Sequence, residues 1–231
     1  MAASAADPAP AGQSRHRNLI LRIVSAVVLG PPVLVAIWIG FPWIDLVAAV
    51  AAPVMVSEWI AMTRGRPLHR LFGIVYSLAA VLALLWLRHQ PAGGRETIVW
   101  IVAVIWATDI GGYVVGRAAG GAKLAPRISP GKTWSGLFGG MAWAAMASAI
   151  CAWAFGLGHT VSLAAFGAAL AVVGQIGDLL ESAAKRQAGL KDSGSLIPGH
   201  GGLLDRVDGL MAVLVVVALV RLLAGGAWPW T

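Results

Sequence analysis

Charged residues and cysteines are scarce in this chain of 231 residues. Only 12% of the residues are Asp, Glu, Lys or Arg, against roughly 25% in an ordinary globular domain. Cys151 is the single cysteine, which excludes a disulfide-stapled fold and a zinc site built on cysteine pairs. The 29 glycines follow no period and 58% of the residues are hydrophobic, which excludes collagen-like and disordered chains.

Apolar residues dominate what remains, and the mean hydropathy is +0.79. A water-exposed surface cannot absorb so many apolar side chains, so the composition predicts an integral membrane protein. Many of the 11 tryptophans lie near the ends of apolar runs, where indole rings prefer the membrane interface. These are Trp38, Trp43, Trp59, Trp86, Trp100, Trp134, Trp228 and Trp230.

Seven apolar runs are long enough to cross a bilayer, which takes about 20 residues in a helix. They cover residues 19–39, 42–62, 71–87, 97–116, 136–156, 161–180 and 207–223. The sequence therefore predicts an all-α polytopic membrane bundle of about seven transmembrane helices. Because the fourth run contains Asp109, totals from five to eight crossings are compatible with the pattern.

Residues 1–18 are rich in Ala, Pro and polar residues without periodicity, which predicts a disordered cytoplasmic tail. The basic cluster at 15–17 is followed by a stretch long enough to span and without a clear cleavage site, so a cleaved signal peptide is not expected. Residues 19–231 then form a single transmembrane domain. Its two long connections, 117–135 and 181–206, are the expected catalytic loops.

The distribution of Lys and Arg predicts that the N-terminus is cytoplasmic. With seven crossings, 14 of the 17 basic residues fall on the cytoplasmic side and only Arg88, Arg95 and Arg221 fall outside. Both long connections then open toward the cytoplasm. No basic run is interleaved with exposed aromatic residues, so nucleic acid is not an expected partner.

The segment 182–210 is the densest in ionisable residues and lies beside a span. Asp205 and Asp208 are spaced i, i+3 and are expected to point the same way on a helix. Carboxylates beside lysines and arginines suit Mg²⁺ together with phosphate oxygens. The glycines around His200 suggest backbone amides free to bind an oxyanion. A solvated positive-inside loop is the alternative. His200 is either a general acid or base or, as favoured here, a hydrogen-bonding residue that shapes the loop.

The fourth and sixth runs contain carboxylates at membrane depth, which is costly without a reason. Asp178, Glu181, Ser182 and Lys185 share one helical face. Asp109 has Gly112 and Gly116 on its own face, so a polar clasp at a close interface of small residues is the alternative there.

Two carboxylates of the second run, Asp45 and Glu58, are expected to be solvated helix ends. The sequence GKT at 131–133 resembles part of a phosphate-binding P-loop, but Pro126 stands where that pattern requires glycine and no buried strand precedes it. Ser129, Lys132 and Thr133 remain candidates for phosphate contacts, with helix capping by Ser129 or Ser135 as the alternative.

The motifs from Ser182 to Asp208 resemble the signature of the phosphatidate cytidylyltransferase, or CDP-diacylglycerol synthase, family. The matching pattern is Ser182-x-x-Lys185-Arg186, Lys191-Asp192 and Pro198-x-His200-Gly201-Gly202-x-x-Asp205-Arg206-x-Asp208. The likeness extends to GDLLES, to ATDIGGYVVGR and to ISPGKTWSG, and covers roughly residues 97–210. In ISPGKTWSG, Gly131 replaces a usual lysine and Ser135 a usual glutamate.

The resemblance implies a Mg²⁺-dependent transfer of CMP from CTP to phosphatidic acid, giving CDP-diacylglycerol and pyrophosphate in phospholipid biosynthesis. It implies catalytic roles for Asp178, Ser182, Lys185, Asp205 and Asp208, with Asp178, Asp205 and Asp208 as metal ligands. It implies substrate binding by Asp109, Ser129, Lys132, Thr133, Arg186, Lys191, His200, Gly201, Gly202 and Arg206. A multi-pass protein of the bacterial inner membrane is expected, and a homodimer is compatible with the sequence.

Two alternatives remain at this point. One is a transporter of an anionic solute, with Asp109, Asp178 and Lys185 as a coupling site, but the chain shows no pair of related halves. The other is a related lipid nucleotidyltransferase or a polyprenol kinase, because the residue chemistry alone does not distinguish cytosine from another base.

Overall fold

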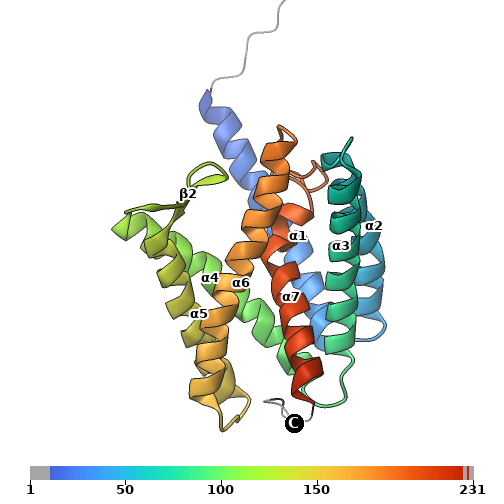
Figure 1. Cartoon of the computed structure of the whole chain (residues 1–231), viewed down its shortest axis with the longest axis vertical. Helices are drawn as coiled ribbons and strands as arrows, with labels where there is room; N and C mark the ends of the chain where they lie inside the picture. Colours follow the sequence, from blue (N-terminus) through green and yellow to red (C-terminus); the bar gives the residue numbers. More distant parts are fainter. Residues whose placement is uncertain (1–10, 226–227, 229–231) are drawn as a thin grey trace, which may run out of the picture.

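The computed structural model describes residues 11–225 and residue 228, and its helices pack as one bundle (Figure 1). Seven helices appear in this part of the chain. They are α1 (Ala11–Ile39), α2 (Trp43–Met62), α3 (Pro67–Arg88), α4 (Gly94–Ala119), α5 (Trp134–Ala154), α6 (Thr160–Gln187) and α7 (Leu204–Ala224). The predicted all-α membrane bundle is confirmed.

Six of these helices, α2 to α7, are long and apolar enough to cross a membrane. In α1 the apolar stretch among the described residues is the shorter Val27–Ile39. The predicted disordered tail is wrong from residue 11 onward, because α1 begins at Ala11. No proline interrupts the chain between Ala11 and Gly30, so the helix extends outward from the apolar run. Residues 1–10 lie outside the described part.

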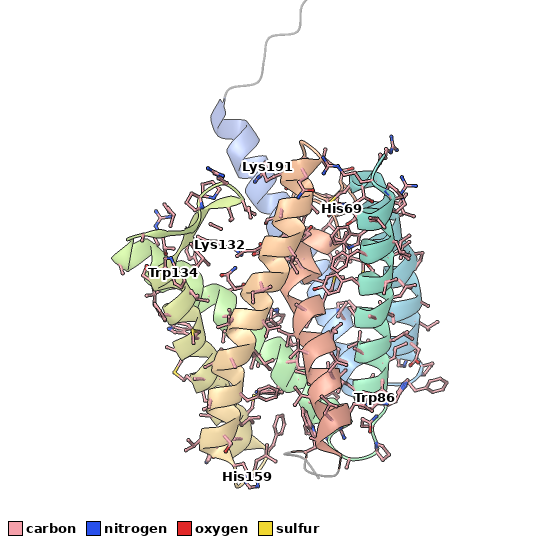
Figure 2. All side chains as sticks on the ribbon, in the orientation of Figure 1. His69, Trp86, Lys132, Trp134, His159 and Lys191 are labelled. Carbon is pink, nitrogen blue, oxygen red and sulfur yellow. The ribbon has the colours of Figure 1, made fainter. Side chains whose placement is uncertain are left out.

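The connection between α4 and α5, which was expected to be a loop, contains a small antiparallel hairpin. It pairs β1 (Lys123–Ala125) with β2 (Ser129–Thr133), with Lys123 opposite Thr133. The Ile128 amide donates to the Ala125 carbonyl at 3.1 Å, which closes a turn with Pro126 at its second position, where proline is favoured. The hairpin directs Lys132 toward α6 (Figure 2).

Helices α4 and α5 pack closely through glycines. A Cβ atom on Gly136 would lie 2.9 Å from the Gly112 carbonyl oxygen, and one on Gly140 would lie 2.9 Å from the Thr108 carbonyl oxygen. A Cβ on Gly116 would likewise lie 3.2 Å from Gly136 Cα. The predicted interface of small residues is confirmed, and it fixes the helix that carries Asp109 against the helix that follows the hairpin.

The core fills the middle of the bundle and extends toward the site. Its larger cluster centres on Trp100, whose Nε1 donates to Ser148 Oγ at 2.9 Å. A smaller cluster of Met55, Trp59, Leu204 and neighbouring residues joins α2, α3 and α7. This cluster brings α2 against the start of α7.

The connections separate into two ends of the bundle. We call the end with the hairpin, the α2–α3 connection and the α6–α7 connection the hairpin end. Figure 2 shows His69, Lys132 and Lys191 at this end and Trp86 and His159 at the other, which we call the opposite end. The loops predicted to share one side of the membrane therefore lie together.

Candidate functional site

The C-terminal half of α6 meets the first turns of α7 at the hairpin end (Figure 1), and these two segments carry Asp178, Ser182, Lys185, Asp205 and Asp208. On α6, Ser182 Oγ donates to Asp178 Oδ1 at 3.1 Å and Lys185 Nζ donates to Glu181 Oε2 at 3.1 Å. The helix therefore presents two polar pairs, as the predicted common face requires. The two pairs have different neighbours: Lys185 contacts α7, whereas Asp178 lines a pocket.

Lys185 connects α6 to α7 through a buried ion pair. Its Nζ lies 2.6 Å from Asp205 Oδ1, and the two side chains are only 10% and 4% exposed. Glu181, on the preceding turn, is buried as well. One buried cation is thus shared by two buried carboxylates, an arrangement that is stable only while each charge keeps its partners.

The other carboxylate oxygen of Asp205 is also occupied. Asp205 Oδ2 accepts hydrogen bonds from Ser193 N at 2.9 Å, Ser193 Oγ at 3.0 Å and Gly202 N at 2.8 Å. Both oxygens therefore hold the chain's own donors. In this arrangement Asp205 fastens the α6–α7 connection to Lys185.

Glu58 of α2 is the principal residue that sequence reasoning missed. Its side chain accepts from Ser193 Oγ at 2.8 Å, Leu203 N at 2.9 Å and Leu204 N at 2.9 Å. The expectation that Glu58 is a solvated helix end is wrong, because the residue is only 7% exposed. Its position inside an apolar run was the available signal. Asp45, in contrast, is partly exposed beside His89, as expected.

The predicted anion-binding amides around His200 already have acceptors within the chain. His200 N and Gly201 N both donate to the Ile197 carbonyl oxygen, at 2.9 and 3.1 Å, and Gly202 N donates to Asp205. This corrects the expectation that these amides are free for an oxyanion. The tight turn satisfies them internally, with Gly201 at a φ of +88° that favours glycine.

His200 makes contacts that shape this turn. Its Nδ1 lies 2.6 Å from Ser25 Oγ of α1, and its carbonyl oxygen accepts from Arg206 Nη2 at 2.9 Å. The segment around His200 is thereby connected to both α1 and α7. These contacts agree with the alternative in which His200 shapes the loop.

A pocket between α4, α6 and α7 collects the remaining carboxylates. Asp109, Asp178, Asp208 and Arg206 all line it, together with Gln175. Asp178 also forms an ion pair with Lys132 from the hairpin, and Asp208 Oδ1 accepts from Gly209 N at 2.7 Å. Acidic side chains from three helices therefore face one space that two basic side chains border.

The predicted metal ligands are not brought together as one set. Asp178 and Asp208 line the pocket, whereas Asp205 is bound to Lys185 and Ser193 outside it. The ion pair with Lys185 holds Asp205 outside the pocket that Asp208 lines. Within residues 11–225 and residue 228, no three acidic, His or Cys side chains are grouped as a metal cluster.

The hairpin residues differ in their roles. Thr133 is buried and caps α5 by accepting from Gly136 N at 3.1 Å, so the cap is neither Ser129 nor Ser135. Lys132 forms an ion pair with Asp178, which lines the pocket, whereas Ser129 is half-buried at the start of β2. The geometry therefore favours Lys132 over Thr133 as a group that meets a ligand.

Two further basic residues lie at the rim of the hairpin end. Arg186 is exposed and donates to the carbonyl oxygens of Ile128 at 3.3 Å and Leu190 at 3.1 Å. Lys191 is exposed as well. Neither lines the pocket of the three aspartates.

The family model described as the Cytidylyltransferase family matches residues 66–224. The chain belongs to the cytidylyltransferase family. The match covers every predicted site residue, from Asp109 to Asp208, whereas Glu58 precedes it. The cytidylyltransferase region therefore contains the pocket but omits α1 and α2, which both contact the α6–α7 connection beside it.

Three phosphatidate cytidylyltransferases align with two thirds or more of the chain. A phosphatidate cytidylyltransferase of Brucella suis is 36% identical over 250 aligned positions, which cover 87% of this chain and 93% of the relative. One of Rickettsia bellii is 33% identical, with 91% and 94% covered. One of Pseudomonas aeruginosa is 42% identical over 159 positions, with 68% and 58% covered. Membership of the cytidylyltransferase family therefore extends over the whole bundle.

Proposed function

We propose that this chain is a phosphatidate cytidylyltransferase that transfers CMP from CTP to phosphatidic acid in phospholipid biosynthesis. The observation that carries the proposal is the pocket of Asp109, Asp178 and Asp208, bordered by Lys132 and Arg206 at one end of a membrane bundle. Relatives bearing that enzyme name support the choice of substrates. An anionic lipid and a nucleoside triphosphate both need such a mixture of charges.

In the proposed reaction, a phosphate oxygen of phosphatidate attacks the α-phosphorus of CTP. The new oxygen–phosphorus bond forms as the bond from the α-phosphorus to the bridging oxygen breaks, and pyrophosphate leaves with that electron pair. Phosphatidate is already anionic at neutral pH, so no general base is required. The chain's task is to position two anions in line and to offset their charge.

Lys132 and Arg206 are suited to that task. Lys132 stands on the hairpin and reaches Asp178, while Arg206 lines the pocket from the first turn of α7. We propose that both contact phosphate oxygens of the bound substrates. Arg186 and Lys191 would extend the basic rim around the triphosphate, and Ser129 would add a hydroxyl donor.

Mg²⁺ is proposed for the pocket rather than for the three ligands first expected, and it would replace the contacts of Lys132 or Ser182 with Asp178. Asp178 and Asp208 supply carboxylate oxygens that line one space, with Asp109 beside them. We propose that Asp178 and Asp208 hold the ion, because Mg²⁺ uses few protein carboxylates and completes its shell with water and phosphate. When bound, the ion would neutralise charge on the phosphates. Asp205 would instead position Lys185.

The six apolar spans make this a multi-pass membrane protein. Because the named relatives come from Brucella, Rickettsia and Pseudomonas, we propose the bacterial inner membrane as its location. The hairpin end would then face the cytoplasm, where CTP is available and where most basic residues are placed.

The decisive experiment uses protein purified in detergent, labelled CTP and phosphatidic acid, with and without Mg²⁺. We expect labelled CDP-diacylglycerol only when all three are supplied. Asp208→Asn is the negative control and Asp45→Asn, at the opposite end of α2, is the matched positive control. Label transferred to another lipid but not to phosphatidate would overturn the proposed substrate, and anionic solute uptake without product would favour the transporter.

A further inference from the structure

The buried carboxylate of Glu58 lies outside the pocket and outside the region matched by the family model. It is on α2, while its hydrogen-bond partners Ser193, Leu203 and Leu204 belong to the α6–α7 connection and the start of α7. A carboxylate at membrane depth is costly unless donors surround it. Here Ser193 Oγ, Leu203 N and Leu204 N supply them.

Two of these donors are backbone amides at the start of α7. The first amides of a helix have no acceptor within the helix, and Leu203, the N-cap residue, provides no side-chain acceptor. Glu58 therefore caps α7 from another helix, and its negative charge is favourable at that end of the helix dipole.

The third donor, Ser193 Oγ, connects Glu58 to Asp205. Ser193 Oγ lies 2.8 Å from Glu58 Oε2 and 3.0 Å from Asp205 Oδ2. Asp205 in turn holds Lys185 at 2.6 Å. A continuous series of polar contacts thus runs from α2 through Ser193 to the ion pair that joins α6 and α7.

Two glycines of the α6–α7 connection lie directly against the Glu58 carboxylate. A Cβ on Gly202 would lie 2.5 Å from Glu58 Oε2 and would also overlap Ser193 Oγ. A Cβ on Gly194 would lie 2.9 Å from Glu58 Oε1. The connection between α6 and α7 is therefore folded tightly around this one carboxylate.

We infer that Glu58 is a positioning residue for the reaction, which fixes the 193–204 segment and, through Ser193 and Asp205, the start of α7 that carries Arg206 and Asp208. The inference rests on the proposed function. It assigns α2, which contributes no residue to the pocket, a part in setting the geometry of nucleotidyl transfer.

The test compares Glu58→Gln with Asp45→Asn, a matched loss of charge on the same helix. Gln has nearly the same shape but directs an amide donor at groups that are themselves donors. We expect Glu58→Gln to lower kcat by about tenfold to a hundredfold, as misplacement of reacting groups does. Asp45→Asn should stay within about twofold of the parent protein.

A purely structural role for Glu58 would reduce the yield of folded protein and leave kcat per folded molecule unchanged. Ser193→Ala, which removes only the relay hydroxyl, provides the second variant. If Glu58 acts through Ser193, the double variant should have nearly the kcat of Glu58→Gln alone. Hydrogen exchange at Leu203 and Leu204 should rise in Glu58→Gln and stay unchanged in Asp45→Asn.

Parent-like kcat in folded Glu58→Gln would overturn this inference and leave the proposed function standing. Fully additive losses in the double variant would overturn the relay through Ser193. A parent protein that makes no CDP-lipid while showing the expected exchange pattern would overturn the proposed function, and with it the catalytic part of the inference.

Discussion

The two ends of the bundle use charged residues differently. At the hairpin end, polar side chains from three helices, the hairpin and the α6–α7 connection contact one another: Lys132 with Asp178, Lys185 with Glu181 and Asp205, and Glu58 with Ser193. Three further carboxylate and guanidinium groups line a pocket there. Charges at this end are therefore arranged around a space.

At the opposite end, arginines mostly bind the backbone. Arg88 donates to the carbonyl oxygens of Ile37 at 2.7 Å and Trp38 at 3.0 Å. Arg221, only 7% exposed, donates to the Ala92 carbonyl oxygen at 2.9 Å. These contacts satisfy carbonyl groups at helix ends and loops. A charge at membrane depth is thus explained by what it contacts. Three aspartates line the pocket at the hairpin end, whereas Arg88, Arg95 and Glu96 line one at the opposite end.

The largest effect is expected at the pocket. Asp208→Asn keeps the shape of the side chain but removes a negative charge from the proposed ion site. Activity should fall by more than about a hundredfold, as when one strong electrostatic contribution to a transition state is lost. The measurement is CDP-lipid formation by purified protein, with the elution profile in detergent as the folding control. Activity within threefold of the parent would remove Asp208 from the site.

The buried ion pair should affect stability as well as turnover. Lys185→Met leaves Asp205 and Glu181 buried without their cation, which should lower the free energy of unfolding by about 3–5 kcal/mol. The midpoint of unfolding in detergent reports the change. Lys185→Arg retains the charge and is the control. An unchanged midpoint in Lys185→Met would show that the two carboxylates do not depend on Lys185.

At the opposite end, Arg221→Gln should destabilise the protein without changing its chemistry. Loss of the bond to Ala92 should cost about 1–2 kcal/mol of stability, while kcat per folded molecule should stay within about twofold. Thermal unfolding and the transfer assay, performed on the same preparation, separate the two quantities. A large loss of kcat would break the contrast between the two ends.

The smallest effect is expected from single cysteine substitutions, which test whether the two ends of the bundle lie on opposite sides of the membrane. Single cysteines at Ser195 and Gly158, which are both exposed, should react with an impermeant thiol reagent from opposite sides of the membrane. Cys151→Ala provides the background. Neither change should alter activity measurably. Labelling of both positions from one side would contradict the predicted alternation of spans.

The sequence predicts the helices and the common side of the long loops well, because apolar runs and basic flanks are local signals. The spacing of Asp178, Ser182 and Lys185 on α6 also follows from local geometry. The close interface between α4 and α5 was predicted only in part. The sequence indicated Gly112 on α4 but not its partner Gly136 on α5. The hairpin was missed, although Pro126 is a recognisable turn residue.

The partners of buried charges were not predictable in the same way. Glu58 meets amides about 145 positions later in the chain, and no local pattern reports such a contact. Asp205 and Asp208 share a helical face, yet Asp205 pairs with Lys185 and only Asp208 lines the pocket. The occupied amides of Gly201 and Gly202 likewise depend on the fold of a turn that residue composition does not specify.

The anchoring of the α6–α7 connection by α2 has a consequence for shortened versions of this protein. A fragment cut at residue 66, where the match to the family begins, would keep every pocket residue and lose Glu58. The first amides of α7 would then be left without their acceptor in a water-poor setting. The boundary suggested by sequence similarity is therefore not the boundary of the smallest self-sufficient unit, which must extend back through α2.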